Sequence, residues 1–212
     1  MIEVLYKFDL MNFLSEYQYF PSVIFYKYSY KYSNIIFEQY ETYQKMSFRN
    51  RCIIAGANGL IHLSVPLKEG RNQKGIMKDM RISNSQKWQS GHWKSIVSCY
   101  NKSPWFEFYK DELHPLYEKH FDFLLDWDLA CFEWSTQKLG LNVKVSATES
   151  LVPVYGGEVA DFRNRILPKN YTGFEAAPYQ QVFESKTGFM PNLSILDLLF
   201  CEGKRAGDIL RG

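Results

Sequence analysis

An Asn58-Gly59 pair between two runs of strand-forming residues is the feature that most constrains how this chain folds. Residues 51–55 before the pair are mostly apolar, and residues 60–65 after it alternate in character. Asn-Gly favours the positive φ angles of a two-residue hairpin turn, so the two runs are predicted to pair as antiparallel strands. Pro66 then ends the second strand or places it at an edge, because proline lacks the N–H that a sheet ladder needs.

Helical periodicity adds helices to this hairpin. One apolar stripe recurs at intervals of four, four and three residues and consists of Trp88, His92, Ile96 and Cys99. Further helices are predicted for residues 22–30, 104–109, 113–125, 129–139 and 192–200, the last with a capping box of Ser194 and Asp197, and strands for residues 33–38, 80–82 and 143–148. We therefore predict a mixed α/β protein of the α+β type, in which a small mixed sheet with an N-terminal hairpin packs against several helices.

Length and composition indicate one cytoplasmic domain. The chain has 212 residues, of which 46% are hydrophobic, enough for a substantial core. The cysteines lie far apart and show no zinc-ligand spacing, so no metal site is expected. No secretory leader is found, and no apolar run approaches the ~20 residues of a membrane span. A reduced, cytoplasmic protein without a membrane span is the consistent interpretation.

Charge and motifs narrow the class of ligand. The net charge is +2, which produces no strong field for nucleic acid, so no nucleic-acid partner is expected. The P-loop, the dinucleotide-binding glycine motif, the nucleophile elbow and the zinc-protease motif are all missing from the sequence. We expect no cofactor and a small-molecule substrate, while homo-oligomerisation stays open.

The segment from Glu41 to Arg51 is rich in groups that bind anions. Its cations are Lys45, Arg49 and Arg51, and its neutral polar groups include Tyr43, Gln44, Ser47 and Asn50. If the segment is extended, its odd-numbered residues share one face that would hold a phosphate or carboxylate. The alternative pairs the cations with Glu38, Glu41 or Asp161, because an unpaired buried charge is very costly.

His92 is the candidate for proton transfer. Its place in the apolar stripe predicts that it points inward from a helix. It is either a core imidazole bonded to a carbonyl or a general acid or base in a partly desolvated cleft, where its pKa lies near 7. Cys99, two helical turns later, makes a Cys/His nucleophile pair geometrically feasible, although a lone cysteine on an apolar stripe is usually a packing residue.

A second polar cluster, Asp161 to Arg165, lies in the long stretch 151–189, which is predicted to be mostly loop. Long loops in compact domains are often functional, and Tyr179 could bring a phenol to the same cleft. The alternative is an exposed loop with local ion pairs. Asp161 and Arg163 are included among the candidate binding residues.

These segments, taken in order, resemble the WbqC-like protein family. The matching pieces are Tyr19-Phe20-Pro21, Tyr43-Gln44-Lys45 with residues 47–51, Asn58-Gly59 with residues 63–66, His92-Trp93-Lys94 before Tyr100, residues 103–109, residues 179–183, and residues 192–200 with Gly203. Tyr17-Gln18 departs from the Gln-Pro that many relatives carry. Relatives commonly begin near Met11, so we expect one WbqC-like domain over residues 1–212, with residues 1–10 as an upstream start extension.

The resemblance implies a bacterial protein of O-antigen or related surface-polysaccharide biosynthesis. We predict a transferase that moves an acyl or aminoacyl group onto a nucleotide-linked amino sugar. The alternative is a non-catalytic sugar-nucleotide-binding or assembly protein of the same pathway. His92 is the predicted catalytic residue. The predicted substrate-binding residues are Tyr19, Tyr43, Lys45, Arg49, Asn50, Arg51, Tyr100, Asp161 and Arg163.

Overall fold

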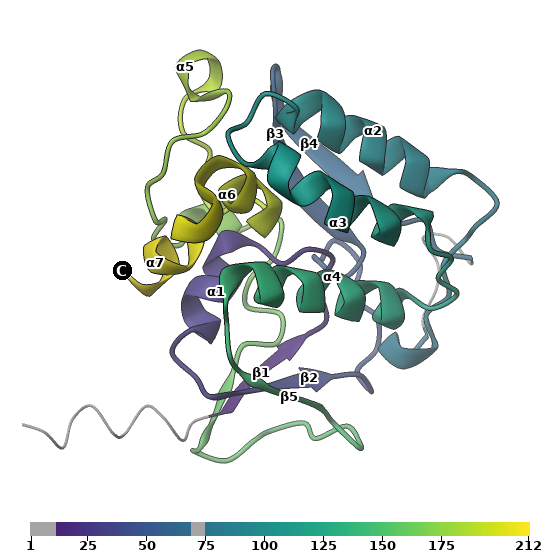
Figure 1. Ribbon diagram of the computed structural model, residues 1–212. Helices are drawn as coiled ribbons and strands as arrows, with labels where there is room; N and C mark the ends of the chain where they lie inside the picture. The colour runs from purple at the N-terminus through teal and green to yellow at the C-terminus, as the bar shows by residue number, and fades with distance from the viewer. Residues whose placement is uncertain (1–11, 69–74) are drawn as a thin grey trace, which may run out of the picture.

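Two separate β-sheets and the helices around them make up the computed structural model, which describes residues 12–68 and 75–212 (Figure 1). The larger sheet has four strands in the order β5-β2-β1-β6, and the smaller one is the hairpin β3-β4. The predicted mixture of helices and strands is confirmed. The larger sheet is parallel in all its pairings, and the hairpin does not join it, unlike the one mixed sheet expected from the sequence.

The parallel sheet is built around β1. Its strands are β1 (Asn12–Glu16), β2 (Asn34–Glu38), β5 (Lys144–Ala147) and β6 (Val159–Asp161). The helix α1 (Val23–Ser29) provides the crossover between β1 and β2 that parallel neighbours require. β1 is buried along nearly all its length, whereas the edge strand β5 is exposed. Because every pairing is parallel, the carboxyl ends of the strands lie at one edge of the sheet.

Helices cover both sheets. Besides α1 they are α2 (Trp88–Tyr100), α3 (Phe106–Glu118), α4 (Leu124–Leu139), α5 (Glu184–Thr187), α6 (Ile195–Glu202) and α7 (Ala206–Arg211), with short 3-10 turns η2 (Met77–Asp79), η3 (Tyr171–Gly173) and η4 (Gly203–Arg205). In Figure 1, α4 runs between the parallel sheet and the α2–α3 pair. Its ring of Phe132 meets Phe37 of β2 edge-on at 4.9 Å, so α4 packs directly on the sheet.

Local signals located the hairpin and the start of α6. β3 (Arg51–Gly56) and β4 (Gly59–Ser64) pair as the predicted hairpin, but the two-residue loop is Ala57-Asn58. Gly59 is already in β4, where it pairs with Gly56 and has a φ of +115° that favours glycine. Ser194 caps α6 by accepting a bond from the backbone N–H of Leu196. Asp197 does not complete the predicted capping box, because its carboxylate accepts bonds from Tyr100 and Tyr179 instead.

Predictions between residues 80 and 125 are partly wrong. The helix predicted over residues 113–125 is two helices, since α3 ends at Glu118 and α4 begins at Leu124. The chain between them runs alongside Ile82, whose N–H donates to the Asp122 carbonyl at 2.8 Å. Residues 80–82 therefore make isolated bridges and not the predicted strand. The sequence predictions also omit β1 and β6, which are short and pair with distant parts of the chain.

Candidate functional site

Acidic side chains gather at the carboxyl edge of the parallel sheet. Glu16 ends β1, Glu38 ends β2 and Asp161 ends β6. Ligands of parallel sheets bind outside the carboxyl ends of the strands, where chain connections run to opposite sides. β1 lies at such a point, with β2 on one side and β6 on the other. This edge is therefore the candidate functional site.

Arg163 ties these strand ends together. Its guanidinium donates to both oxygens of Asp161 at 2.6 to 3.1 Å, and Nη1 reaches Oε2 of Glu38 at 3.3 Å. Burial raises the pKa of Asp161, but the hydrogen bonds and charge of Arg163 outweigh it, so the pKa lies below its usual value. The structure thus brings Asp161 and Arg163 together as a half-buried ion pair at the strand ends.

Arg49 forms a second centre of charge at this edge and is fully buried. Its Nη2 donates to Oε1 of Glu41 and to Oδ1 of Asn164, the latter at 2.9 Å. The backbone N–H of Asn164 donates in turn to Oε2 of Glu16 at 2.9 Å. Asn164 has a left-handed φ of +59°, which asparagine tolerates better than most residues. For Arg49, the alternative of an internal ion pair with Glu41 is confirmed.

The extended conformation considered for residues 43–51 is wrong. Residues 45–50 form turns and bends, and Met46 has a φ of +54°. The hydroxyl of Ser47 donates to the Gln44 carbonyl at 2.6 Å, a local bond that competes with strand pairing. The turns send Lys45 out to solvent while Arg49 points into the protein. The predicted single face of cations is therefore broken up.

Asn50 and Arg51 belong to the hairpin and not to the acidic edge. The side-chain amide of Asn50 donates to the Val65 carbonyl at 2.9 Å. Nε of Arg51 donates to the hydroxyl of Ser64 across the strand pair at 3.2 Å. Both contacts hold the open end of β3 and β4 together, so a ligand role for these two residues stays a prediction.

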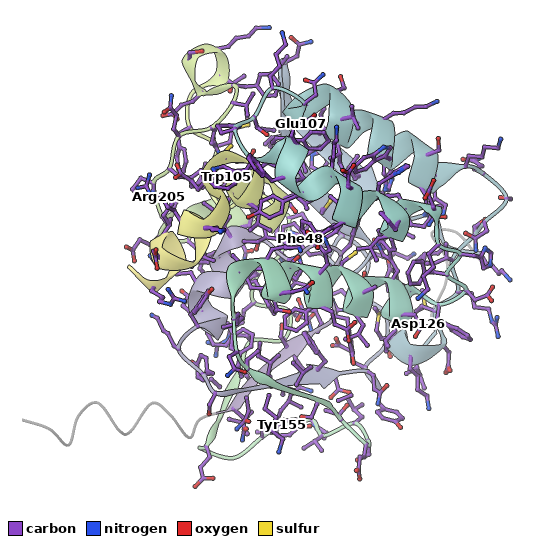
Figure 2. The ribbon with its side chains drawn as sticks, in the orientation of Figure 1. Phe48, Trp105, Glu107, Asp126, Tyr155 and Arg205 are labelled. Atoms are coloured by element: carbon purple, nitrogen blue, oxygen red, sulfur yellow. The ribbon has the colours of Figure 1, made fainter. Side chains whose placement is uncertain are left out.

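An open pocket of about 470 Å³ lies beside the charges at the acidic edge. Its lining residues are Glu41, Leu151, Pro153, Asp161, Arg163, Asn164 and Arg165. Figure 2 shows Tyr155 below the parallel sheet, and its ring centroid lies 5.4 Å from the guanidinium carbon of Arg163. Burial raises the pKa of Glu41, and the charge of Arg49 offsets part of this rise. The pocket offers carboxylates and guanidiniums to a polar ligand.

His92 lies elsewhere, on α2 between aromatic rings. Its Nδ1 is 3.0 Å from the hydroxyl of Tyr19, and its ring meets that of Trp88 at 5.1 Å between centroids. Burial lowers the pKa of His92 to about 4, against a backbone hydrogen bond with Ser64 that acts in the other direction. The imidazole is therefore neutral at neutral pH, and its role in proton transfer stays a prediction.

We expect His92 to make folding stability depend on pH between 6.5 and about 4. In this range the unfolded chain binds the extra proton, because the folded-state pKa is the lower one. Stability is therefore fully present above pH 6.5 and decreases as the pH falls, by at most about 3 kcal/mol. Urea unfolding of the wild type and His92→Asn across this range measures the difference in slope.

His120→Asn is the matched control for this titration, because the His120 side chain is 66% exposed. The control should keep the pH slope of the wild type, while His92→Asn should flatten it. Equal slopes for wild type and His92→Asn would contradict a buried, neutral His92.

The tyrosines predicted to line the pocket lie in different surroundings. Tyr19 is fully buried, and its hydroxyl also lies 3.1 Å from that of Tyr117. Tyr43 is partly buried near Arg49; burial raises its pKa to about 12, and the charge of Arg49 opposes the rise. Of these two, Tyr43 is the one that the structure places near the acidic edge.

Tyr100 is part of a buried network around Asp197. Its hydroxyl donates to Oδ1 of Asp197 at 2.6 Å and accepts the N–H of Ala55 at 3.0 Å. Tyr179 and Gln181 donate to Oδ2 of the same carboxylate at 2.7 and 2.9 Å. The network ties α2, β3 and the segment before α5 to α6. Neither Tyr100 nor Tyr179 lines the pocket at the acidic edge, and Tyr179 lines a different pocket of about 840 Å³.

Several polar residues of the acidic edge are missing from the sequence predictions. Glu16, Gln18 and Asp128 are buried, and Asn164 is partly buried. An acidic residue at the end of the short run 12–16 is a signal that could have located Glu16. Asp128 has no such signal, because its position in α4 resembles an ordinary polar position of an amphipathic helix.

The parallel sheet, the separate hairpin and the surrounding helices define a protein of mixed helices and strands, and the charged pocket at the carboxyl edge of the sheet is its candidate site. The chain belongs to the WbqC-like protein family, whose model matches residues 17–167. It is 28% identical over 195 residues to the uncharacterized protein Rv1507c of Mycobacterium tuberculosis, an alignment that covers 80% of this chain and 84% of the relative. No solved structure matches the chain significantly.

Residues 12–68 and 75–212 contain neither a helix that could span a membrane nor a cluster of metal-ligating side chains. Every helix in these ranges is too short or too polar to cross a bilayer. The same residues contain no group of three or more His, Cys, Asp or Glu side chains that could hold a metal ion.

Proposed function

We propose that this protein transfers an acyl or aminoacyl group to the amine of a nucleotide-linked amino sugar, in the surface-polysaccharide setting that its family implies. The observation that carries the proposal is the pocket at the strand ends, where Glu41 and Asp161 stand beside Arg163 and Arg165. Carboxylates accept bonds from sugar hydroxyls and amines, and guanidinium groups bind phosphate. Each part of such a substrate therefore has a complementary group in the pocket.

Carboxylates outnumber guanidiniums at this edge. The acids are Glu16, Glu38, Glu41 and Asp161, and the bases are Arg49, Arg163 and Arg165. A ligand that brings positive charge relieves this imbalance, because buried like charges repel. The edge therefore favours a substrate with an ammonium group over one that is only anionic.

Glu41 is the group best placed to take the proton from the sugar amine. Its side chain is 12% exposed and lines the pocket. Burial raises its pKa, which makes it a stronger base than a free carboxylate. In the proposed step, the amine nitrogen attacks the carbonyl carbon of an acyl thioester, the C–N bond forms as the C–S bond breaks, and the amine proton passes through Glu41 to the departing thiolate.

One observation favours the alternative of a non-catalytic binding protein. Both oxygens of Glu41 already have partners, since Oε1 accepts a bond from Arg49 and Oε2 accepts one from Nδ2 of Asn164 at 3.3 Å. A carboxylate held in this way can orient a sugar without taking a proton. Binding and turnover must therefore be measured separately.

We expect Glu41→Gln to reduce turnover by roughly 10²–10⁴-fold, because the amide keeps the shape of the side chain but cannot act as a base. Thermal shifts with UDP-glucosamine and UDP-glucose measure binding and the preference for the amine. Chromatographic detection of N-acylated product after incubation with acyl and aminoacyl thioesters measures turnover. Glu149→Gln, in the exposed segment after β5, is the matched control.

The outcomes distinguish the transferase from the non-catalytic binding protein and test the roles of Glu41 and His92. Binding of the amino sugar with no product from any thioester favours the binding protein. Equal shifts with UDP-glucosamine and UDP-glucose contradict recognition of the amine. Full activity of Glu41→Gln removes Glu41 from proton transfer, and the activity of His92→Asn in the same assay tests the role predicted for His92.

A further inference from the structure

Arg163 lines the pocket at the acidic edge, but its guanidinium is fully engaged within the protein. Nη1 donates to the Val152 carbonyl at 3.0 Å and to Glu38 at 3.3 Å. Nη2 donates to the Pro153 carbonyl at 3.1 Å and to Asp161, to which Nε also donates. These contacts use every N–H that a guanidinium carries. Arg163 therefore holds the segment of Val152 and Pro153 against the strand ends and has no donor left for a ligand.

The two carboxylates that line this pocket differ in the same respect. Oδ1 of Asp161 accepts the backbone N–H and Nε of Arg163, each at 3.0 Å, and Oδ2 accepts Nε at 3.1 Å and Nη2 at 2.6 Å. These bonds occupy the lone pairs of both oxygens. Each oxygen of Glu41 accepts only one bond, from Arg49 or from Asn164. Glu41 is therefore the carboxylate that can accept a further bond from a ligand.

Arg165 is the cation of the pocket that has unused donors. Its guanidinium forms no hydrogen bond or ion pair with residues 12–68 or 75–212. Its carbon Cζ lies 5.3 Å from the centroid of the Phe162 ring. That ring is held in turn by Phe13 at 4.7 Å and Tyr28 at 4.8 Å between centroids. Contact with a fixed ring restricts the guanidinium while its N–H groups stay free, so less entropy is lost when it binds.

The surroundings of Arg165 distinguish it from an ordinary solvated arginine. It is exposed, but it lines a pocket of about 470 Å³ together with Glu41 and Asp161. These carboxylates repel an anion, so an anionic group enters the pocket only if a cation with free donors meets it. A guanidinium binds phosphate through two parallel N–H bonds, which Arg165 can supply and Arg163 cannot.

We propose that Arg165 binds the phosphate of a phosphorylated amino sugar, whose amine is directed to Glu41. Arg163 and Asp161 support the pocket and do not contact the phosphate. A nucleotide-linked sugar and a sugar 1-phosphate share this chemistry of an amine and a phosphate on one ligand. The inference deepens the proposed function, on which it rests for the role of the sugar as acyl acceptor though not for its binding.

Calorimetric titration with UDP-glucosamine, glucosamine 1-phosphate and glucosamine tests the inference. The two phosphorylated ligands should bind at least roughly tenfold more tightly than glucosamine. Arg165→Gln should weaken both of them roughly 10-fold, and Arg165→Lys should weaken them less, because lysine keeps the charge but not the planar pair of donors. Arg205→Gln is the matched control, since Arg205 is 78% exposed and does not line the pocket (Figure 2).

Urea unfolding separates the residue that binds the phosphate from the residue that supports the pocket. Arg163→Gln should lower the midpoint of unfolding, because it leaves Asp161 and Glu38 without their cation. Arg165→Gln should leave the midpoint unchanged, because its side chain makes no polar contact among the described residues. Should Arg165→Gln fail to fold, Arg165→Lys and the comparison of the three ligands on the wild type decide.

The following results would overturn the inference. Wild-type affinity in Arg165→Gln shows that Arg165 does not contact the phosphate. An equal loss of affinity in Arg205→Gln shows an effect of net charge and not of contact. Failure of both phosphorylated ligands to bind the wild-type protein has the same consequence. N-acylation of UDP-glucosamine at full rate by Arg165→Gln leaves the proposed function standing and this inference wrong. Binding of glucosamine 1-phosphate that depends on Arg165, without acylation of any sugar, supports this inference and contradicts the proposed function.

Discussion

Replacing Gly203 by alanine is expected to destabilise the folded protein by about 3–5 kcal/mol. Gly203 follows α6 with a φ of +56° and a ψ of −124°, a backbone conformation that L side chains rarely adopt. An added Cβ would lie 2.1 Å from Cδ2 and 2.4 Å from Cε2 of Trp105. The backbone N–H of Trp105 donates to the Phe200 carbonyl at 3.0 Å, which anchors the Trp105 main chain beside α6 (Figure 2).

Gly140→Ala is the matched control for this substitution. Gly140 ends α4 with a φ of +61°, and a Cβ there would meet nothing within 4 Å. Both substitutions reduce the entropy of the unfolded chain equally. The difference between their costs in free energy of unfolding therefore reports the backbone conformation of Gly203 and the contact with Trp105. We expect the control to cost about 1 kcal/mol in urea unfolding. A difference below about 1 kcal/mol between the two variants would show that the Trp105 ring yields to the added carbon.

Arg49→Met is expected to destabilise the protein by about 3–5 kcal/mol, because it leaves the Glu41 carboxylate without its cation in a largely buried place. The guanidinium of Arg49 also bonds Asn164, which holds the loop after β6 against Glu16. Loss of the cation should therefore loosen this loop as well. Urea unfolding gives the change in free energy, and hydrogen exchange of the Asn164 amide reports on the loop.

Lys45→Met removes a cation from the same turn and is the matched control, since Lys45 is exposed. Its cost should stay within about 0.5 kcal/mol. The cost of Arg49→Met should shrink at low pH, because protonation of Glu41 removes the unpaired charge. A cost that is independent of pH would mean that packing, and not charge, is what Arg49 contributes.

The elements that the sequence located are those whose causes are local. The hairpin follows from Asn58-Gly59, and α1 and β2 follow from a proline, a periodic run and a β-branched run within a short stretch. The cap of α6 depends on Ser194 and the N–H of Leu196. The interactions that form turns and helix caps involve only a few consecutive residues, so the order of residues in the sequence is enough to predict them.

The candidate site could be predicted only in pieces. The sequence identifies Arg49 as a cation that needs a partner if it is buried, because unpaired charge is costly in a protein interior. It identifies Arg163 only as part of a polar cluster in a long loop. Their partners are distant in the chain: Arg49 and Asn164 are 115 positions apart, and Arg163 and Glu38 are 125 apart. No spacing rule links such residues. Asp128 lies in α4, between Arg49 and Arg163 in the sequence. No local sequence pattern predicts that it is buried near Arg49.

The sequence by itself therefore determined the hairpin, most of the helices, the family and the presence of cations too costly to bury alone. The tertiary structure decided which acids meet those cations. Parallel pairing of β1 with β2 and β6 puts Glu16, Glu38 and Asp161 at one edge, and strand pairs of this kind form between segments far apart in the chain. These strand pairs form because they bury a shared sheet. That burial depends on contacts between distant segments, so no pattern in neighbouring residues predicts it.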